Sequence, residues 1–194
     1  SYAAGLKKRK KLNCALGMQI VLLPENHAEI VPLAKIAKRI GMDYLVVKPY
    51  SQHPLSRTTH YKSIRYSRYL GLAEDLHRIC GNGFNAIFRI HAMKKWDAGA
   101  PPYQHCLALP FWAYLDSRGD VWACSIYLTK QKFCLGNIYR NSFRRIWESQ
   151  KRRNLVRWAR NTLDTRQCRV NCRMDEVNRY LWELTHPPEH VNFI

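Results

Sequence analysis

Four cysteines in the C-terminal half constrain the fold of this chain more than any other feature. Cys106 and Cys124 flank the segment CLALPFWAYLDSRGDVWAC, which has the pattern C-x12-G-x4-C, and the second pair stands three residues apart in CRVNCR. These spacings suit four thiolates that converge on one iron–sulfur or zinc centre. The sequence therefore predicts a metal centre with four ligands, Cys106, Cys124, Cys168 and Cys172.

The use of cysteine indicates a reducing environment. The chain has seven cysteines with irregular spacing, and its N-terminal segment carries the basic run KKRKK instead of the apolar core of a secretory signal. We therefore expect reduced thiols or metal ligands and not a disulfide framework. No run of about 18 uncharged apolar residues is present, so we predict a soluble, cytoplasmic protein without a membrane partner. The chain begins with Ser1 and not with Met, which suggests a processed or incomplete chain.

The formal charge of +18 is spread along the chain and has two interpretations. Such a charge suits a nucleic-acid partner, but it equally suits a phosphorylated substrate or an acidic protein. The sequence has no polar basic tail, no RNA-binding aromatic motif and no finger-type Cys/His spacing. Nucleic-acid binding is therefore the less favoured interpretation.

Residues 1–91 are expected to alternate strands with helices. Three apolar runs predict buried parallel strands, MQIVLL at 18–23, YLVV at 44–47 and NAIFRI at 85–90. Helices are expected between them, at about 29–40 and about 63–80, and residues 2–12 look like the tail of a helix whose preceding strand is absent. The resulting order β-α-β-α-β predicts three parallel strands covered by helices.

The composition changes at residues 93–105, where Gly and paired prolines predict a linker. Beyond it, LPFWAYL and DVWACSIYL predict a hairpin with Gly119 in the left-handed region, Asp116 paired with Gly119, and Cys124 opposite Phe111. The first strand is expected to begin at Pro110, so that residues 106–109 form a loop over the hairpin face.

Two helices are expected after the hairpin, one from the N-cap Ser142 and one at about 173–184. The second would carry one apolar stripe, formed by Met174, Val177, Tyr180, Leu181 and Leu184.

Residues 106–194 resemble the twitch domain, a shorter relative of the SPASM domain that follows the catalytic barrel in many radical S-adenosylmethionine (SAM) enzymes. The resemblance lies in the C-x12-G-x4-C hairpin, the segment LGNI followed by helix FRRIW, the pair in CRVNCR and the ending HVNFI. It implies that Cys106, Cys124, Cys168 and Cys172 hold an auxiliary [4Fe–4S] cluster. Residues 1–92 are similar to the last strands of the partial barrel in the same enzymes.

The fold class that follows is α/β. Residues 1–92 would form the C-terminal half of a partial (β/α)6 barrel, with about three parallel strands and their helices. Residues 93–105 would be the linker, and residues 106–194 a small α+β domain of the twitch/SPASM type with a β-hairpin and two helices.

The chain departs from the family in three ways. It lacks the CxxxCxxC motif that holds the SAM-cleaving [4Fe–4S] cluster, its second pair is C-x3-C where C-x2-C is common, and the cysteine-rich motif of a full SPASM domain is missing. The resemblance therefore implies the C-terminal portion of a radical SAM enzyme that binds one auxiliary cluster and does not generate the radical alone.

In the intact enzyme the resemblance implies SAM, a second [4Fe–4S] cluster and an electron donor such as flavodoxin or ferredoxin. The auxiliary cluster would support substrate binding or electron transfer during radical-based modification of a sugar, nucleoside or peptide. The basic surface favours a phosphorylated or acidic substrate, either a small molecule or a peptide. Two alternatives stay open: a zinc-stabilised basic nucleic-acid-binding module, and a stand-alone cluster-binding accessory protein.

The sequence identifies no catalytic residue. Five polar residues lie within or just after the predicted strands, where parallel α/β folds bind ligands, and they are candidates for contact with SAM or substrate: Gln19, Asn26, Lys48, Ser51 and Arg89. Salt bridges or loop hydrogen bonds explain each of them equally well.

The remaining cysteines and the loop histidines have simpler explanations. Cys134 is an alternative cluster ligand or a core thiol beside Phe133, and Cys14 and Cys80 are interpreted as packing residues. Three histidines could be ligands but are more simply interpreted as solvated loop residues: His53, His60 and His105. Five tryptophans are interpreted as core residues that would also shield a cluster from solvent: Trp112, Trp122, Trp147, Trp158 and Trp182.

Overall fold

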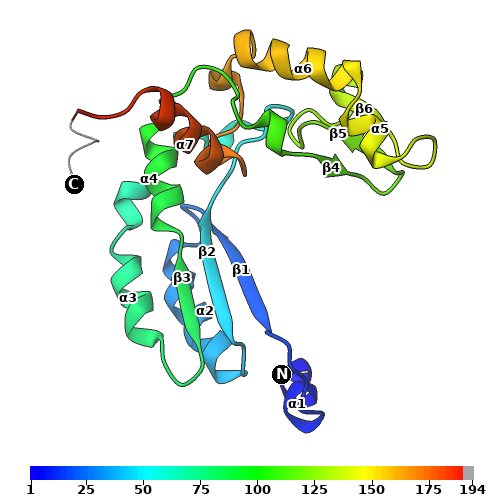
Figure 1. Ribbon diagram of the computed structural model, residues 1–194. Coiled ribbons are helices and arrows are strands. Elements are labelled where there is room, and N and C mark those ends of the chain that lie inside the picture. Colours follow the sequence, from blue (N-terminus) through cyan, green and yellow to red (C-terminus); the bar gives the residue numbers. More distant parts are fainter. Residues whose placement is uncertain (190–194) are drawn as a thin grey trace. The chain divides into compact units, whose positions relative to one another are not determined.

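The computed structural model describes residues 1–189, and the ending HVNFI used in the family resemblance lies outside them. The chain divides into two compact units (Figure 1). The first contains residues 1–52 and 56–99, and the second contains residues 53–55 and the chain from Ala100 onward.

The first unit is built on the predicted three-stranded parallel sheet. Strands β1 (Gly17–Leu22), β2 (Tyr44–Pro49) and β3 (Asn85–Phe88) lie in the order β1-β2-β3, with Met18 opposite Leu45 and Leu45 opposite Ala86. This confirms the parallel sheet. The six-stranded barrel to which it was assigned remains a prediction.

Helices cover the sheet because their apolar residues recur on one face. Helix α2 (Ile30–Arg39) buries Ile30, Ala34 and Ala37 and packs on β2, while α3 (Leu72–Ile79) packs on β3 and α2 (Figure 1). Helix α4 (Ile90–Ala98) packs on β2. A short helix α1 (Tyr2–Arg9) precedes β1, within the residues expected to be helical.

The prediction of a helix at about 63–80 is wrong over the first half of that range. Residues 60–63 and 66–69 form two 3-10 turns, and α3 begins only at Leu72. Long-range hydrogen bonds explain the difference: Asp97 accepts from the backbone N–H groups of Tyr66 and Ser67, at 2.8 and 2.6 Å, and Trp96 Nε1 donates to the Ile64 carbonyl at 3.0 Å. These tertiary bonds hold the backbone in turns that helical periodicity does not predict.

The third strand ends at Phe88, two residues earlier than expected, because α4 starts at Ile90. Helix α4 continues to Ala98 and buries Met93 and Trp96, so half of the segment expected as a linker is helical. Met93 and Trp96 stand three residues apart and therefore lie on one helix face, a signal that the linker prediction did not use.

Tyr66 ties the strand ends of this unit together. Its side chain is fully buried, its hydroxyl donates to the Leu22 carbonyl at 2.9 Å, and it accepts from the Tyr50 N–H at 2.6 Å. Tyr66→Phe leaves both backbone groups without this partner, so we expect it to lower the free energy of unfolding by about 1–3 kcal/mol. Urea unfolding of the variant, with the exposed Tyr2→Phe as control, measures the effect.

Burial also raises the pKa of Tyr66 to about 12, from an ordinary value near 10. Because the folded state holds this proton more tightly, the contribution is fully present below pH 10 and is lost as pH rises toward 12. We expect the Tyr66→Phe variant to lose less stability than the wild type between pH 10 and pH 12. Equal losses in the two proteins would contradict the assignment.

Over the residues that the structure describes, the second unit contains an antiparallel sheet and three helices. Strands β4 (Tyr114–Leu115), β5 (Asp120–Trp122) and β6 (Cys134–Asn137) lie in the order β4-β5-β6. Helices α5 (Phe143–Trp147), α6 (Gln150–Asn161) and α7 (Asp175–Thr185) follow (Figure 1). The buried core joins the sheet to α5 and α6, with Val121, Trp122, Leu135, Ile146, Leu155 and Ala159 among its members.

The predicted hairpin exists, but its register is shifted by one residue. The Gly119 N–H does donate to the Asp116 carbonyl, at 3.0 Å, but the Asp116 N–H donates to the Asp120 carbonyl, at 3.1 Å, so that Leu115 lies opposite Val121 and Tyr114 opposite Trp122. The Asp116 side chain sets this turn by accepting hydrogen bonds from the N–H groups of Arg118 and Asp120 and from Trp122 Nε1. Gly119 has φ +79°, as expected, but Cys124 lies beyond the paired residues and is not opposite Phe111.

Three further expectations for this unit are wrong. No strand begins at Pro110, because residues 109–111 form a 3-10 turn with the proline in its first turn. Two helices were expected where the described residues form three, and in the stripe predicted on α7 both Tyr180 and Leu184 are exposed while Asp175 and Asn178 are buried. By contrast, the helix FRRIW capped by Ser142 is confirmed as α5, and it follows LGNI, most of which lies in the unpredicted strand β6.

Candidate metal centre

The four predicted thiols come from three separate segments of the second unit. Cys106 precedes the 3-10 turn at residues 109–111, Cys124 lies two residues after the end of β5, and Cys168 and Cys172 lie just before α7. Cys106 and Cys124 pack against the buried core of the unit. All four are half-buried and have free thiols.

The fold brings these four thiols into one group. Cys168 interacts electrostatically with Cys106, Cys124 and Cys172, and Cys124 also interacts with Cys106 and Cys172. Burial, followed by these neighbouring thiols, raises the pKa of Cys124 to about 11, and burial likewise raises the pKa of Cys168 to about 12. The half-buried group would therefore concentrate negative charge if its members ionised.

Hydrogen-bond donors point at the sulfur atoms. The N–H groups of Ile126 and Tyr127 bond to Cys124 and partly offset the effect of burial on its pKa. Cys106 has the same arrangement with the N–H groups two and three residues on, which belong to Ala108 and Leu109. Donors at these positions stabilise sulfur that carries negative charge, as it does when bound to a metal.

Asn178 connects Cys106 to helix α7. Its side-chain oxygen accepts from the N–H groups of Leu107 and Ala108, at 2.7 and 2.9 Å, and its amide donates to the Met174 carbonyl at 3.1 Å and to Cys106 Sγ at 3.9 Å. Only 3% of Asn178 is exposed. One buried side chain therefore fixes the conformation of the Cys106 segment.

A second buried network links the segments around the thiols. The Tyr103 hydroxyl donates to Asp175 at 2.7 Å, and Arg179 Nε donates to the other oxygen of that carboxylate at 2.9 Å. Thr165 Oγ1 lies 2.7 Å from the Tyr103 carbonyl oxygen, to which it donates. These bonds join the chain before Cys106, the turn before Cys168 and the helix after Cys172 without any contribution from a metal.

Tyr127 contributes on the side of Cys168. Its hydroxyl lies 3.7 Å from Cys168 Sγ, and its ring stacks on Phe133 with centroids 4.3 Å apart. Phe133 in turn contacts the edge of Trp158, whose ring centroid is 6.0 Å away. The prediction that aromatic residues shield the site named Trp158 but missed Tyr127.

Sequence reasoning also missed Asn178, Asp175 and Tyr103. A signal for Asn178 was available, because it stands four residues after Met174 and therefore lies on the apolar stripe predicted for the last helix. A polar residue on such a stripe needs buried hydrogen-bond partners. Nothing in the sequence indicates the pairing of Tyr103 with Asp175.

Within residues 1–189, no three His, Cys, Asp or Glu side chains form a group suited to a single metal ion. This finding is compatible with the interaction of the four thiols, because electrostatic interaction reaches further than a coordination bond. Four thiolates on one zinc ion, each at about 2.3 Å, would have sulfur atoms about 4 Å apart. Ligands of a four-iron cluster bind different irons and are more widely spaced.

The other cysteines and the histidines have separate environments. Cys134 Sγ lies 3.9 Å from the Gly136 carbonyl and packs on the core, and it does not appear among the interactions described for the four thiols. Cys14 is exposed, and Cys80 accepts from the Ala86 N–H at 3.3 Å. His53 accepts from the Leu55 N–H, His60 lies 3.7 Å from Glu25, and His105 lies 3.1 Å from the Leu163 carbonyl.

The five polar candidates of the first unit have mostly structural contacts. Lys48 Nζ donates to Gln19 Oε1 at 2.8 Å, so these two are brought together. Asn26 is used within its own loop, where it bonds to Leu23 N–H and the Val21 carbonyl. The Arg89 N–H bonds to the Val47 carbonyl. Ser51 follows β2, as expected.

Comparison with known families identifies the segment that contains the four thiols. Residues 106–173 match SPASM, described as an iron–sulfur cluster-binding domain. The segment resembles SPASM. The expected resemblance to a SPASM-type domain is therefore confirmed over a stretch that begins at Cys106 and includes all four cysteines.

Comparisons with other proteins add little to the SPASM match. No curated protein matches the chain. Among solved structures, the chain is similar to BtrN, crystallised as the selenomethionine protein in an open conformation, with 11% sequence identity. That match covers 84% of this chain and 94% of BtrN, but its TM-score of 0.30 is too low to support a conclusion. The described residues contain no helix long and apolar enough to cross a membrane.

Proposed function

We propose that Cys106, Cys124, Cys168 and Cys172 bind an auxiliary [4Fe–4S] cluster in the C-terminal portion of a radical SAM enzyme. The observation that carries this proposal is the convergence of four half-buried thiols from three segments, with mutual electrostatic interactions. The match of residues 106–173 to an iron–sulfur cluster-binding domain supports it. The finer assignment to a radical SAM enzyme rests on the motifs described from the sequence.

The donor set fits such a cluster. Four cysteine thiolates are the usual ligands of a [4Fe–4S] cluster, and N–H groups directed at two of the sulfurs would adjust its reduction potential. Burial by Tyr127, Phe133 and Trp158 limits the access of water to the Cys168 side. When bound, a cluster here would accept or relay one electron at a time.

Loading this site requires the loss of protons from its thiols. Burial raises the pKa of Cys106, Cys124 and Cys168, so these thiols are protonated at neutral pH before a metal binds. These thiols would have to lose their protons to act as ligands, and coordination would offset the repulsion that four thiolates have for one another. The buried network around Asn178 and Asp175 keeps the ligand segments in place before this step.

Metal analysis tests the proposal. We expect the anaerobically purified or reconstituted chain to contain about four iron and four sulfide ions, and the quadruple alanine variant of the four cysteines to contain neither. The matched control is Cys14→Ala, because that thiol is exposed and distant in sequence. Zinc without sulfide in the wild type would reject the cluster and support a zinc-stabilised module.

The role in a larger enzyme has its own test. The sequence lacks the CxxxCxxC motif, so we propose that the radical is generated by a part of the enzyme outside this chain. An upstream CxxxCxxC in the same reading frame of the parent gene is the expected result. Its absence would favour a stand-alone cluster-binding accessory protein.

A further inference from the structure

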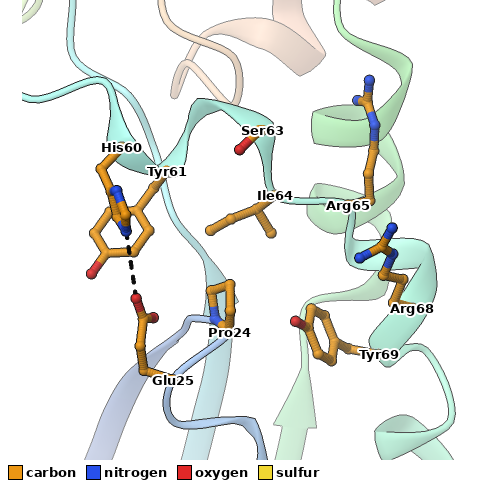
Figure 2. A pocket seen from close by; sticks show the side chains of 9 residues that line it. All are labelled: Pro24, Glu25, His60, Tyr61, Ser63, Ile64, Arg65, Arg68 and Tyr69. Atoms are coloured by element: carbon orange, nitrogen blue, oxygen red, sulfur yellow. Dashed lines mark ion pairs between the residues drawn. The ribbon is translucent and has the colours of Figure 1, made fainter.

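The first unit contains a cavity of about 280 Å³ beside the carboxyl end of β1. All of its lining residues precede the four cysteines in the sequence. Pro24 and Glu25, which follow β1, form one wall, and residues 60–69 form the other (Figure 2). In open parallel sheets, this edge is where ligands bind. None of the five polar candidates named from the sequence lines this cavity.

The cavity carries an excess of positive charge. Arg65 and Arg68 line it, and neither forms an ion pair with any residue in the described part of the chain. Its one carboxylate, Glu25, lies 3.7 Å from His60 Nε2 (Figure 2). Residues 54–73, which supply most of the wall, contain no Asp or Glu. Figure 2 shows the Arg68 guanidinium turned toward the cavity, where it is available to an anion, whereas the Arg65 side chain extends away and would reach an anion only after a change of rotamer.

Uncharged groups complete the lining. Figure 2 shows the hydroxyl oxygens of Ser63 and Tyr69 directed toward the space around Ile64, with Pro24 on the opposite side. Hydroxyl groups donate to anionic oxygens, and Ile64 and Pro24 offer apolar contact to a carbon framework. Glu25 can accept hydrogen bonds from hydroxyl groups of a ligand. The lining thus suits an anionic group attached to a small polyhydroxylated body.

The arginine-bearing wall is held in place before any ligand binds. Buried Tyr66 stands between the two arginines and bonds to the Leu22 carbonyl at the end of β1. Asp97 accepts from the N–H groups of Tyr66 and Ser67, and this fixes the turn that carries Arg68. A wall fixed in this way loses little conformational entropy on binding.

We propose that this cavity binds a small phosphomonoester of about the size of a pentose phosphate. A guanidinium group binds phosphate with two hydrogen bonds, and the cavity volume lies just below the usual range for small-molecule sites, which excludes a large dinucleotide. The proposal is independent of the metal centre, because all of its residues belong to the first unit.

Calorimetric titration of the chain with ribose 5-phosphate tests the proposal, with inorganic phosphate and ribose as the comparison ligands. We expect ribose 5-phosphate to bind more tightly than inorganic phosphate, and ribose not to bind. No heat of binding with ribose 5-phosphate would overturn the proposal. Equal affinity for inorganic phosphate would also overturn it, since the organic body would then contribute nothing.

The matched variants are Arg65→Gln/Arg68→Gln and the control Arg57→Gln/Lys62→Gln. Both remove two positive charges from the same segment, but Arg57 and Lys62 do not line the cavity. We expect the first variant to weaken ribose 5-phosphate binding by at least about tenfold and the control by less than about twofold. If both variants lost affinity equally, the loss would be explained by the change in net charge alone, and the proposal would be overturned.

Ser63→Ala is a second variant that leaves the charge unchanged. It removes one hydroxyl directed toward the cavity, and we expect a severalfold loss of affinity for ribose 5-phosphate with an unchanged circular dichroism spectrum. Unchanged affinity would contradict the placement of the ligand. The titration is repeated on the quadruple cysteine variant, so that binding of ribose 5-phosphate is measured separately from cluster content.

Discussion

Cys124→Ala is expected to remove the cluster while Cys134→Ala retains it. We expect the iron content to fall from about four to less than one per chain in the first variant and to remain at about four in the second. The two cysteines are matched, since both are half-buried, both follow or belong to a strand of the same sheet, and both pack on the same core. Iron and sulfide analysis, together with the visible absorption of the reconstituted proteins, measures the difference.

The contrast depends on which thiols interact with one another. Cys124 interacts electrostatically with Cys106 and Cys172 and accepts N–H groups from Ile126 and Tyr127. Cys134 instead lies close to the Gly136 carbonyl oxygen, which does not stabilise a thiolate. If Cys134→Ala lost iron and Cys124→Ala retained it, Cys134 would be the ligand and the assignment of Cys124 would be wrong.

The strands of the first unit were predictable because each is a continuous apolar run. Leu22, Leu45 and Val47 are fully buried, as their position in a parallel sheet covered by helices requires. The segment between β2 and α3 was not predictable, because its conformation depends on Asp97 and on the hydroxyl of Tyr66, which act across about 30 and 44 positions of the chain. The local pattern of apolar residues does not indicate such long-range contacts.

In the second unit, the sequence predicted the grouping of the four cysteines more reliably than the backbone around them. The four cysteines were found from their spacing and from family motifs, and the fold brings them together. The hairpin register was missed by one residue because the Asp116 side chain bonds to the N–H groups of the turn. Strand β6 was missed because Gly136 gives little strand signal; there a Cβ atom would lie 3.0 Å from Ile146, so the glycine allows α5 to approach the sheet.

Asn178→Leu is expected to have the largest effect on stability among single changes near the metal centre. The substitution removes the acceptor of two buried N–H groups, those of Leu107 and Ala108. Each buried donor without a partner costs about 1–3 kcal/mol, so we expect the free energy of unfolding to fall by about 2–4 kcal/mol. Denaturant unfolding of the metal-free protein measures this loss without interference from cluster binding.

Asn178→Asp separates the structural role of this residue from its effect on Cys106. The aspartate keeps an acceptor for both N–H groups but loses the donor to Met174 and Cys106, and it places a negative charge beside a thiolate ligand. We therefore expect a smaller loss of stability than in Asn178→Leu, but faster loss of iron to a chelator, by about tenfold or more. Iron release as slow as in the wild type would show that neither the lost amide donor nor the added charge acts on the sulfur, and that Asn178 supports the backbone alone.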